Sequence, residues 1–168
     1  MFLLAGSQAT QCPMRRVTGC GYAGLAHVQA LIAGGAYSST AQTRMPTMSG
    51  PGWSSMLTGV WSNKHGVLNN IFTHKNYEKY PDLLTRLERI NPSFSTFAAA
   101  GWPPILSTAS NGPIISDNVD VKFSFKAPHQ PEYQEFDRRI AEVASLYLSR
   151  ANVDAAFVYF GDVDGVGI

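Results

Sequence analysis

The sequence predicts an α/β fold with a mainly parallel β-sheet and helices on both faces. Apolar runs typical of buried strands alternate along the chain with amphipathic helical patterns, and this order is typical of parallel sheets. The clearest strand, residues 155–160, is a continuous apolar run followed at once by Asp162 and Asp164. The chain has 168 residues, 45% hydrophobic and 15% charged, which suffices for one domain with its own core.

The N-terminal half is expected to form two helices with a short strand between them. In residues 23–33, apolar side chains recur at helical spacing, and a pair of glycines follows as a stop signal. Residues 36–42 are interpreted as the short strand. A second helix places Trp53 and Leu57 on one face and ends near Gly59.

The C-terminal half continues the alternation. A helix is expected over residues 81–90, because a proline opens this segment and Asn-Pro follows it. Residues 94–99 form the next predicted strand, and the Pro-, Ser- and Gly-rich residues 101–113 a loop. Residues 119–125 alternate as a half-buried strand. Residues 132–150 carry the strongest helical periodicity, which indicates core packing.

Charge and cysteine content narrow the classes of partner. A formal net charge of +1 provides no bulk field that would attract nucleic acid or an anionic membrane surface. No segment reaches transmembrane length, and no signal peptide is evident. Cys12 and Cys20 allow a disulfide, but their spacing is not that of a metal finger. Compartment and oligomeric state stay open.

The stretch PTMSGPGWSS places Ser49 directly before Gly-Pro-Gly and an apolar helical segment. Glycine and proline fix the backbone at the start of a helix, where the first N–H groups have no partner inside the helix and can hold an anion. Two roles for Ser49 are open at this point. The serine either caps the helix or acts as a nucleophile that faces a phosphate.

The residues around Ser49 form a long pattern, in which PT-x-S precedes a helix that ends in TG and is followed by HG and an Asn. The matching residues are Pro46, Thr47, Ser49, Thr58, Gly59, His65, Gly66 and Asn70. This pattern resembles the nucleophile block of the type I phosphodiesterase and nucleotide pyrophosphatase family, within the alkaline phosphatase superfamily. The segments YPDLLTRLE, WPPI and YFGDVDGVG also resemble bacterial members, so the similarity covers roughly residues 27–167.

The resemblance implies an alkaline phosphatase-like core and metal-dependent hydrolysis of phosphodiester or pyrophosphate bonds in small nucleotide-type substrates. Ser49 would be the nucleophile, forming a phosphoserine, and Asn70 would donate to a phosphoryl oxygen. Asp164 and Ser49 would bind metal, for which family members usually hold two zinc ions. His65 is interpreted as a structural residue at the turn after the helix. Family members are often exported or periplasmic, which leaves the location of this chain open.

Three departures from the family pattern stand out. No Asp or Glu occurs before Glu78, although the family places a metal-binding Asp at the end of its first strand. Ile168 stands where the Asp-x-x-Gly-His motif around Asp164 has its histidine, and later metal ligands have no counterpart. We therefore expect an N-terminal fragment that is inactive as it stands. Residues 1–26 would form a divergent segment and residues 27–168 a partial domain.

Alternatives to the phosphodiesterase interpretation remain. The lost ligands allow a non-catalytic remnant, which serves as a binding domain or has no stable fold. A metal-free serine hydrolase is a weaker alternative, because TMSGP does not match the G-x-S-x-G signature of such enzymes. Asn70 also has a purely structural interpretation as a turn residue beside Asn69. Nothing in the sequence identifies the substrate.

Overall fold

The computed structural model describes residues 26–38, 40–45, 47–108, 111–125 and 133–161. The chain divides into two compact units, with the main boundary between Thr43 and Arg44. Helix α1, Ala26–Gly34, belongs to the first unit and has no buried residue. It corresponds to the helix predicted at residues 23–33. All the other described helices and strands belong to the second unit.

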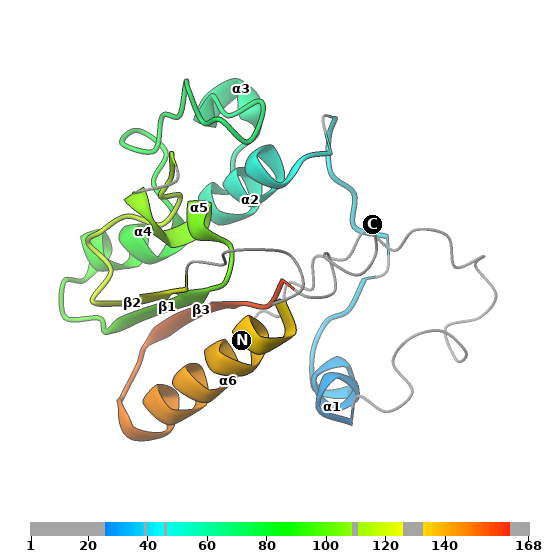
Figure 1. Cartoon of the computed structure of the whole chain (residues 1–168), viewed down its shortest axis with the longest axis vertical. Helices are drawn as coiled ribbons and strands as arrows, with labels where there is room; N and C mark the ends of the chain where they lie inside the picture. The colour runs from blue at the N-terminus through cyan, green and yellow to red at the C-terminus, as the bar shows by residue number, and fades with distance from the viewer. Residues whose placement is uncertain (1–25, 39, 46, 109–110, 126–132, 162–168) are drawn as a thin grey trace. The chain divides into compact units, whose positions relative to one another are not determined.

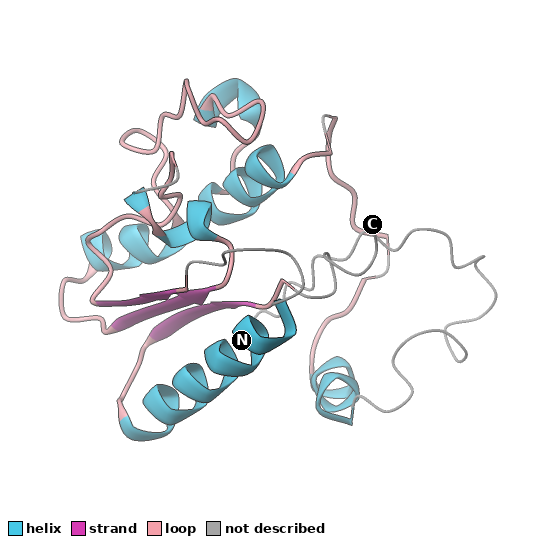
Figure 2. Ribbon diagram, in the orientation of Figure 1, coloured by secondary structure: helices cyan, strands magenta, loops and turns pink. Residues whose placement is uncertain are grey.

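The second unit is built on a parallel sheet (Figure 2). Its strands are β1, Thr96–Ala100, β2, Val121–Ser124, and β3, Ala155–Tyr159, in the order β2-β1-β3. Strand β1 pairs in parallel with both neighbours. All five residues of β1 are buried, as is typical of a central strand covered on both faces.

Helices cover both faces of this sheet (Figure 1). Helix α6, Tyr133–Arg150, packs on one face, where Ile140 and Ala144 contact Phe97 and Ala99 of β1. The opposite face is covered by α2, Ser49–Thr58, α4, Leu83–Ile90, and α5, Pro103–Leu106. The predicted α/β class, with a parallel sheet and helices on both faces, is confirmed. None of the described helices combines the length and apolar character that crossing a bilayer requires.

Local sequence signals set the ends of α2 and α4. Helix α2 ends at Gly59, which adopts the left-handed conformation with φ 70° that glycine tolerates best. Helix α4 begins after Asp82, whose carboxylate accepts hydrogen bonds from the backbone N–H and the hydroxyl of Thr85. Arg86 of α4 donates to the carbonyl of Thr58 and so joins the two helices.

Two local predictions are wrong. The described residues between 36 and 42 form no strand and are exposed, because no neighbouring strand in the described part supplies the hydrogen bonds that an extended segment needs. The predicted loop at residues 101–113 contains the short helix α5, in which prolines occupy the first helical positions. A further short helix, α3, Ser62–His65, has too few residues for a periodic pattern to reveal it.

Candidate active site

Ser49 is the first residue of α2. The N-cap position is Met48, an extended residue with φ −112° and ψ 154°, and no side chain caps the helix from that position. The interpretation of Ser49 as the capping residue is therefore wrong. Its side chain is half-buried, and within the described part of the chain its hydroxyl has no hydrogen-bond partner. The hydroxyl is thus available for chemistry.

The start of α2 lies at the carboxyl end of the sheet. Trp53, one turn after Ser49, packs edge-on against Tyr159, the last residue of β3, with ring centroids 4.8 Å apart. Its contact with Phe157 is longer, at 6.0 Å between centroids. In parallel α/β sheets the carboxyl edge is where ligands bind. Trp53 itself, 8% exposed, belongs to the core.

The N-terminus of α2, where the sequence suggests an anion could bind, has few free N–H groups. Gly50 N–H donates to Asn70 Oδ1 at 2.7 Å, and Gly52 N–H donates to the carbonyl of Met48 at 3.0 Å. Pro51 has no N–H to offer. Of the first four helical positions, only the N–H of Ser49 has no acceptor among the described residues. The Gly-Pro-Gly segment shapes the turn but contributes little to holding an anion.

At this end of the helix, the side-chain amide of Asn70 offers hydrogen-bond donors. Because its Oδ1 accepts the N–H of Gly50, its Nδ2 group keeps both hydrogens for an outside acceptor, and the side chain is exposed. A Cβ at Gly50 would lie 2.6 Å from the carbonyl oxygen of Asn69, so only glycine permits this approach. Asn69 itself forms a turn by accepting the N–H of Ile71. The structure thus brings Asn70 to the N–H of Gly50, the residue that follows Ser49 in α2. The roles expected for Ser49 and Asn70 in catalysis stay predictions.

His65 is a buried structural residue, which confirms the role expected for it. The side chain is 0% exposed, and its Nδ1 accepts the N–H of Val67 at 3.0 Å. Its Nε2 lies 3.0 Å from Ser55 Oγ. Burial lowers the pKa of His65 from its ordinary value, so the ring is neutral at pH 7. Both ring nitrogens are engaged within the protein, which leaves none for a metal.

Asp164, the residue expected to bind metal after β3, lies outside the described residues. The same is true of Asp162 and Pro46. The chain leaving β3 is described as far as Gly161, whose N–H donates to Asp137 Oδ1 of α6 at 2.8 Å. Sequence reasoning missed Asp137, because no periodicity distinguishes it from an exposed helical carboxylate.

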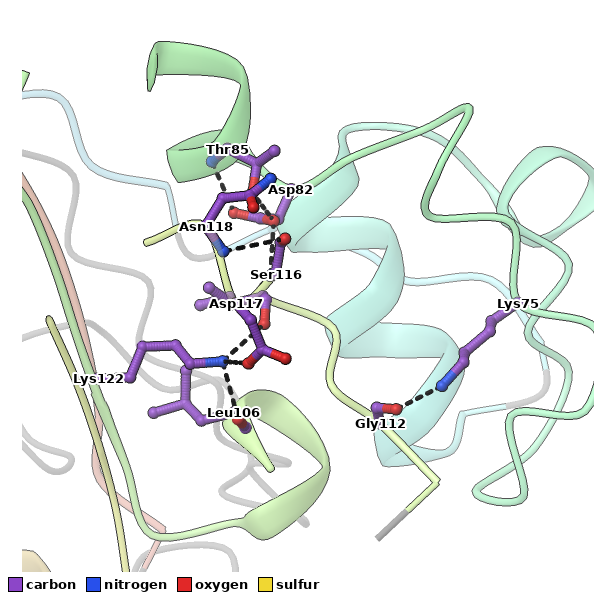
Figure 3. A network of polar contacts seen from close by, with 10 residues as sticks. Lys75, Asp82, Thr85, Leu106, Gly112, Ser116, Asp117, Asn118 and Lys122 are labelled. Atoms are coloured by element: carbon purple, nitrogen blue, oxygen red, sulfur yellow. Dashed lines mark hydrogen bonds and ion pairs between the residues drawn. The ribbon is translucent and has the colours of Figure 1, made fainter. Parts of the chain in front are cut away.

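Most of the described carboxylates are engaged in structural contacts. Asp82 is 1% exposed and accepts hydrogen bonds from Thr85 and from the N–H of Ser116, which fixes the loop after α5 to the start of α4 (Figure 3). Lys75 donates to the carbonyl of Gly112 in the same loop. No group of three or more His, Cys, Asp or Glu side chains within the described part could hold a metal ion. The described residues alone therefore do not fit a zinc site.

The model of the family described as type I phosphodiesterase / nucleotide pyrophosphatase matches residues 20–167, which is most of the chain. The chain belongs to this family. A search of the curated proteins and a search of the solved structures returned no match. The parallel sheet with helices on both faces is consistent with the alkaline phosphatase-like fold of type I phosphodiesterases. Membership of this phosphodiesterase family indicates a hydrolase of phosphodiester or pyrophosphate bonds with small nucleotide-type substrates.

Proposed function

We propose that Ser49 is the nucleophile of a phosphodiesterase or nucleotide pyrophosphatase that acts through a phosphoserine. The observation that carries this proposal is the pairing at the start of α2. The half-buried hydroxyl of Ser49 has no partner among the described residues. Asn70, whose Oδ1 accepts the N–H of Gly50, the next residue in the helix, keeps both Nδ2 hydrogens free. Family membership supports the substrate class.

The chemistry that follows is a double displacement at phosphorus. Ser49 Oγ forms a bond to phosphorus, the bond to the leaving oxygen breaks, and the serine proton passes to solvent or to the leaving group. Water then attacks the phosphoserine, the Ser49 Oγ–P bond breaks, and the serine regains a proton. The amide of Asn70 donates to a non-bridging oxygen, where negative charge develops. Because Gly50 already holds this amide in place, little reorganisation is needed.

Metal dependence is part of the proposal and rests on the resemblance of the sequence. Ser49 and Asp164 are the proposed zinc ligands, and zinc would supply charge neutralisation and a lower pKa for the serine hydroxyl. The absence of any Asp or Glu before Glu78 favours the companion proposal that these 168 residues alone have little turnover. The same lack of acidic residues supports the alternative that the chain is a non-catalytic remnant.

A chromogenic phosphodiester assay tests the proposal. Hydrolysis of bis(4-nitrophenyl) phosphate is measured with zinc and after chelation, for the chain itself and for a fusion that adds the metal-binding part of a family member. We expect zinc-dependent turnover in the fusion, its loss in Ser49→Ala, and no change in Ser149→Ala, a serine on α6. Full activity of the Ser49→Ala fusion would rule out Ser49 as nucleophile. Zinc-dependent turnover by the chain alone would overturn the companion proposal.

A fluorophosphonate probe tests the metal-free serine hydrolase alternative. Such a probe labels serines that a general base activates, and our proposal expects no labelling of Ser49 in zinc-free chain. Stoichiometric labelling under chelation would favour the alternative. Phosphoserine trapped at Ser49 by rapid acid quench, and detected by mass spectrometry, would support the double displacement.

A further inference from the structure

The first turn of α2 is held by two adjacent serines. Ser54 Oγ donates to the carbonyl of Gly50 at 2.6 Å, and Ser55 Oγ donates to the carbonyl of Pro51 at 2.8 Å. Gly50 and Pro51 are the two residues that follow Ser49 in the helix. Back-bonding of this kind is common in helices and on its own has no special meaning. Here, however, each serine oxygen is also contacted from another part of the chain.

The direction of each contact follows from the hydrogens available. A serine hydroxyl has one hydrogen, and Ser55 gives it to the carbonyl of Pro51, so the contact with His65 Nε2 requires the imidazole to donate. The N–H of Val67 points at Nδ1, which independently assigns the ring hydrogen to Nε2. In the same way, Ser54 gives its hydrogen to Gly50, so Tyr77 donates its hydroxyl hydrogen to Ser54 at 2.7 Å.

Burial keeps His65 neutral and Tyr77 protonated, as their hydrogen bonds to Ser55 and Ser54 require. Ser54 and His65 are 0% exposed, so water does not compete for these hydrogen bonds. Burial raises the pKa of Tyr77 to about 12, and the phenol therefore keeps its hydrogen at neutral pH. His65 precedes Asn70 in the chain and Tyr77 follows it, so one segment supplies three contacts to the same helical turn.

We propose that His65 and Tyr77 are positioning residues for Ser49, which act through Ser55 and Ser54 on the first turn of α2. Together these four side chains form the first-turn clamp. The clamp fixes the carbonyls of Gly50 and Pro51, while Asn70 fixes the N–H of Gly50. Hydrogen bonds to other side chains therefore hold both carbonyl and N–H groups of the turn that presents Ser49. The link to catalysis rests on the proposed function of Ser49.

Two substitutions at His65 separate the clamp from the neighbouring turn. His65→Gln places an amide N–H near the position of Nε2 and can donate to Ser55, but it gives up the contact with Val67. His65→Asn places an oxygen near Nδ1 and keeps the contact with Val67, but it cannot reach Ser55. The clamp therefore predicts that His65→Gln retains function and His65→Asn does not. A role confined to the turn at Val67 predicts the opposite order.

The first measurement is turnover by the active zinc-loaded fusion described above. We expect His65→Asn and Ser55→Ala each to lower kcat by about 10- to 100-fold with little change in KM, because a misplaced nucleophile affects the chemical step most. The double variant His65→Asn, Ser55→Ala is expected to be no slower than either single variant, because each substitution alone already removes the hydrogen bond between Ser55 and His65. Tyr77→Phe is expected to lower kcat too, while its matched control Tyr80→Phe is not. Equal kcat in His65→Gln and His65→Asn would overturn the proposal.

The second measurement does not depend on activity. Amide hydrogen exchange of Gly52, whose N–H closes the first turn onto Met48, is followed in the 168-residue chain without metal. We expect faster exchange in His65→Asn, Ser55→Ala and Tyr77→Phe than in His65→Gln and Tyr80→Phe. Similar exchange in all five variants would overturn the clamp even if the fusion is active. If the fusion shows no turnover with any metal, the proposed function fails, and exchange alone then decides the clamp.

Discussion

His65 is neutral because burial excludes the charged ring and because the N–H of Val67 occupies the side of Nδ1 where a second proton would sit. In the unfolded chain the His65 ring does not have this restriction and has its ordinary pKa of 6.5. As pH falls below that value, the unfolded state takes up a proton that the folded state resists. Stability from this residue is therefore complete above the unfolded pKa and declines as pH falls towards the lowered folded pKa.

This difference predicts a measurable loss of stability in mild acid. The urea midpoint of the chain is expected to fall between about pH 7.5 and about pH 5.5. The decline should be smaller in His65→Gln, which has no group that titrates in this window at this position. The other three histidines, His27, His74 and His129, are present in both proteins, so the comparison isolates position 65. Identical pH dependence in the two proteins would contradict a buried neutral His65.

Asn70 combines two tasks that substitutions can separate. Asn70→Asp keeps an oxygen for the N–H of Gly50, so we expect its free energy of unfolding to stay within about 0.5 kcal/mol of the parent value. Asn70→Ala leaves that N–H without its partner and is expected to cost about 1 kcal/mol, as the loss of a helix cap does. The measurement is urea unfolding, with Asn152→Ala as a control at an exposed asparagine. Equal destabilisation of the two Asn70 variants would contradict the capping role.

In the fusion, turnover should follow the other task of this side chain. Both Asn70 variants lose the Nδ2 donor, and the aspartate also places a negative charge beside the phosphate. We therefore expect Asn70→Asp to be slower than Asn70→Ala, and both to be faster than Ser49→Ala, since one donor among several is easier to replace than the nucleophile. An Asn70→Asp fusion as active as the parent would exclude a donor role for Asn70.

At the residue scale, the sequence located the candidate site but not what supports it. Ser49 and Asn70 are recognisable because they belong to a long, spaced pattern. The contacts of Ser54 with Tyr77 and of Ser55 with His65 depend on how the segment after α2 folds back, and no periodicity encodes that path. The helix N–H groups have less capacity to bind an anion than the sequence suggests, because a side chain from a distant position already occupies one of them.

Helix α2 contains two glycines with opposite requirements. At Gly50 a Cβ would lie 2.6 Å from the Asn69 carbonyl and 2.9 Å from Asn70 Oδ1, whereas at Gly52 nothing lies within 4 Å. Gly50→Ala is therefore expected to lower the free energy of unfolding by about 1–3 kcal/mol, through a forced shift of backbone. Gly52→Ala should raise it by up to about 1 kcal/mol, because alanine favours a helix. Urea unfolding of the matched pair tests this, and equal effects would contradict the close approach at Gly50.

The elements that sequence reasoning found are those with a strong pattern and a partner. Strand β1 and helix α6 are examples, since the first is apolar after Thr96 and wholly buried, and the second has a regular apolar stripe that packs on it. The strand predicted at residues 36–42 had a suitable composition but has no partner in the described part. Helix α5 was missed because its Pro-Pro start was interpreted as a loop signal, although proline is well tolerated in a first helical turn.

At the scale of the whole molecule, every buried core residue that the structure describes lies in the second unit. Both apolar clusters, one on each face of the sheet, are formed by described residues from Trp53 onwards, and α1 buries none of its side chains. The fold class was predictable because the alternation of apolar runs and amphipathic helices is a property of the whole chain. Residues 1–26 were predicted to be a separate segment, and this division stays a prediction.

A chain that begins at Arg44 is expected to keep the core intact. Its urea midpoint and the slope of its unfolding transition should match those of the full chain, because no described residue of the first unit contributes to either cluster. Tryptophan fluorescence follows the transition, since Trp53 and Trp102 lie in or against the core. Loss of a cooperative transition in the shortened chain would show that the first 43 residues are needed for folding.

The contacts that hold the start of α2 also have a consequence for the order of folding. They join residues only 10, 20 and 23 positions apart, whereas the chain entering β3 is joined to the residue before β1 by a hydrogen bond that spans 59 positions. Closing short loops costs less entropy, so the surroundings of Ser49 are expected to form before the sheet is complete. In stopped-flow experiments, Tyr77→Phe should mainly slow refolding, while Val158→Ala should mainly accelerate unfolding. The part of the chain that carries the chemistry would then be the part that guides the rest into place.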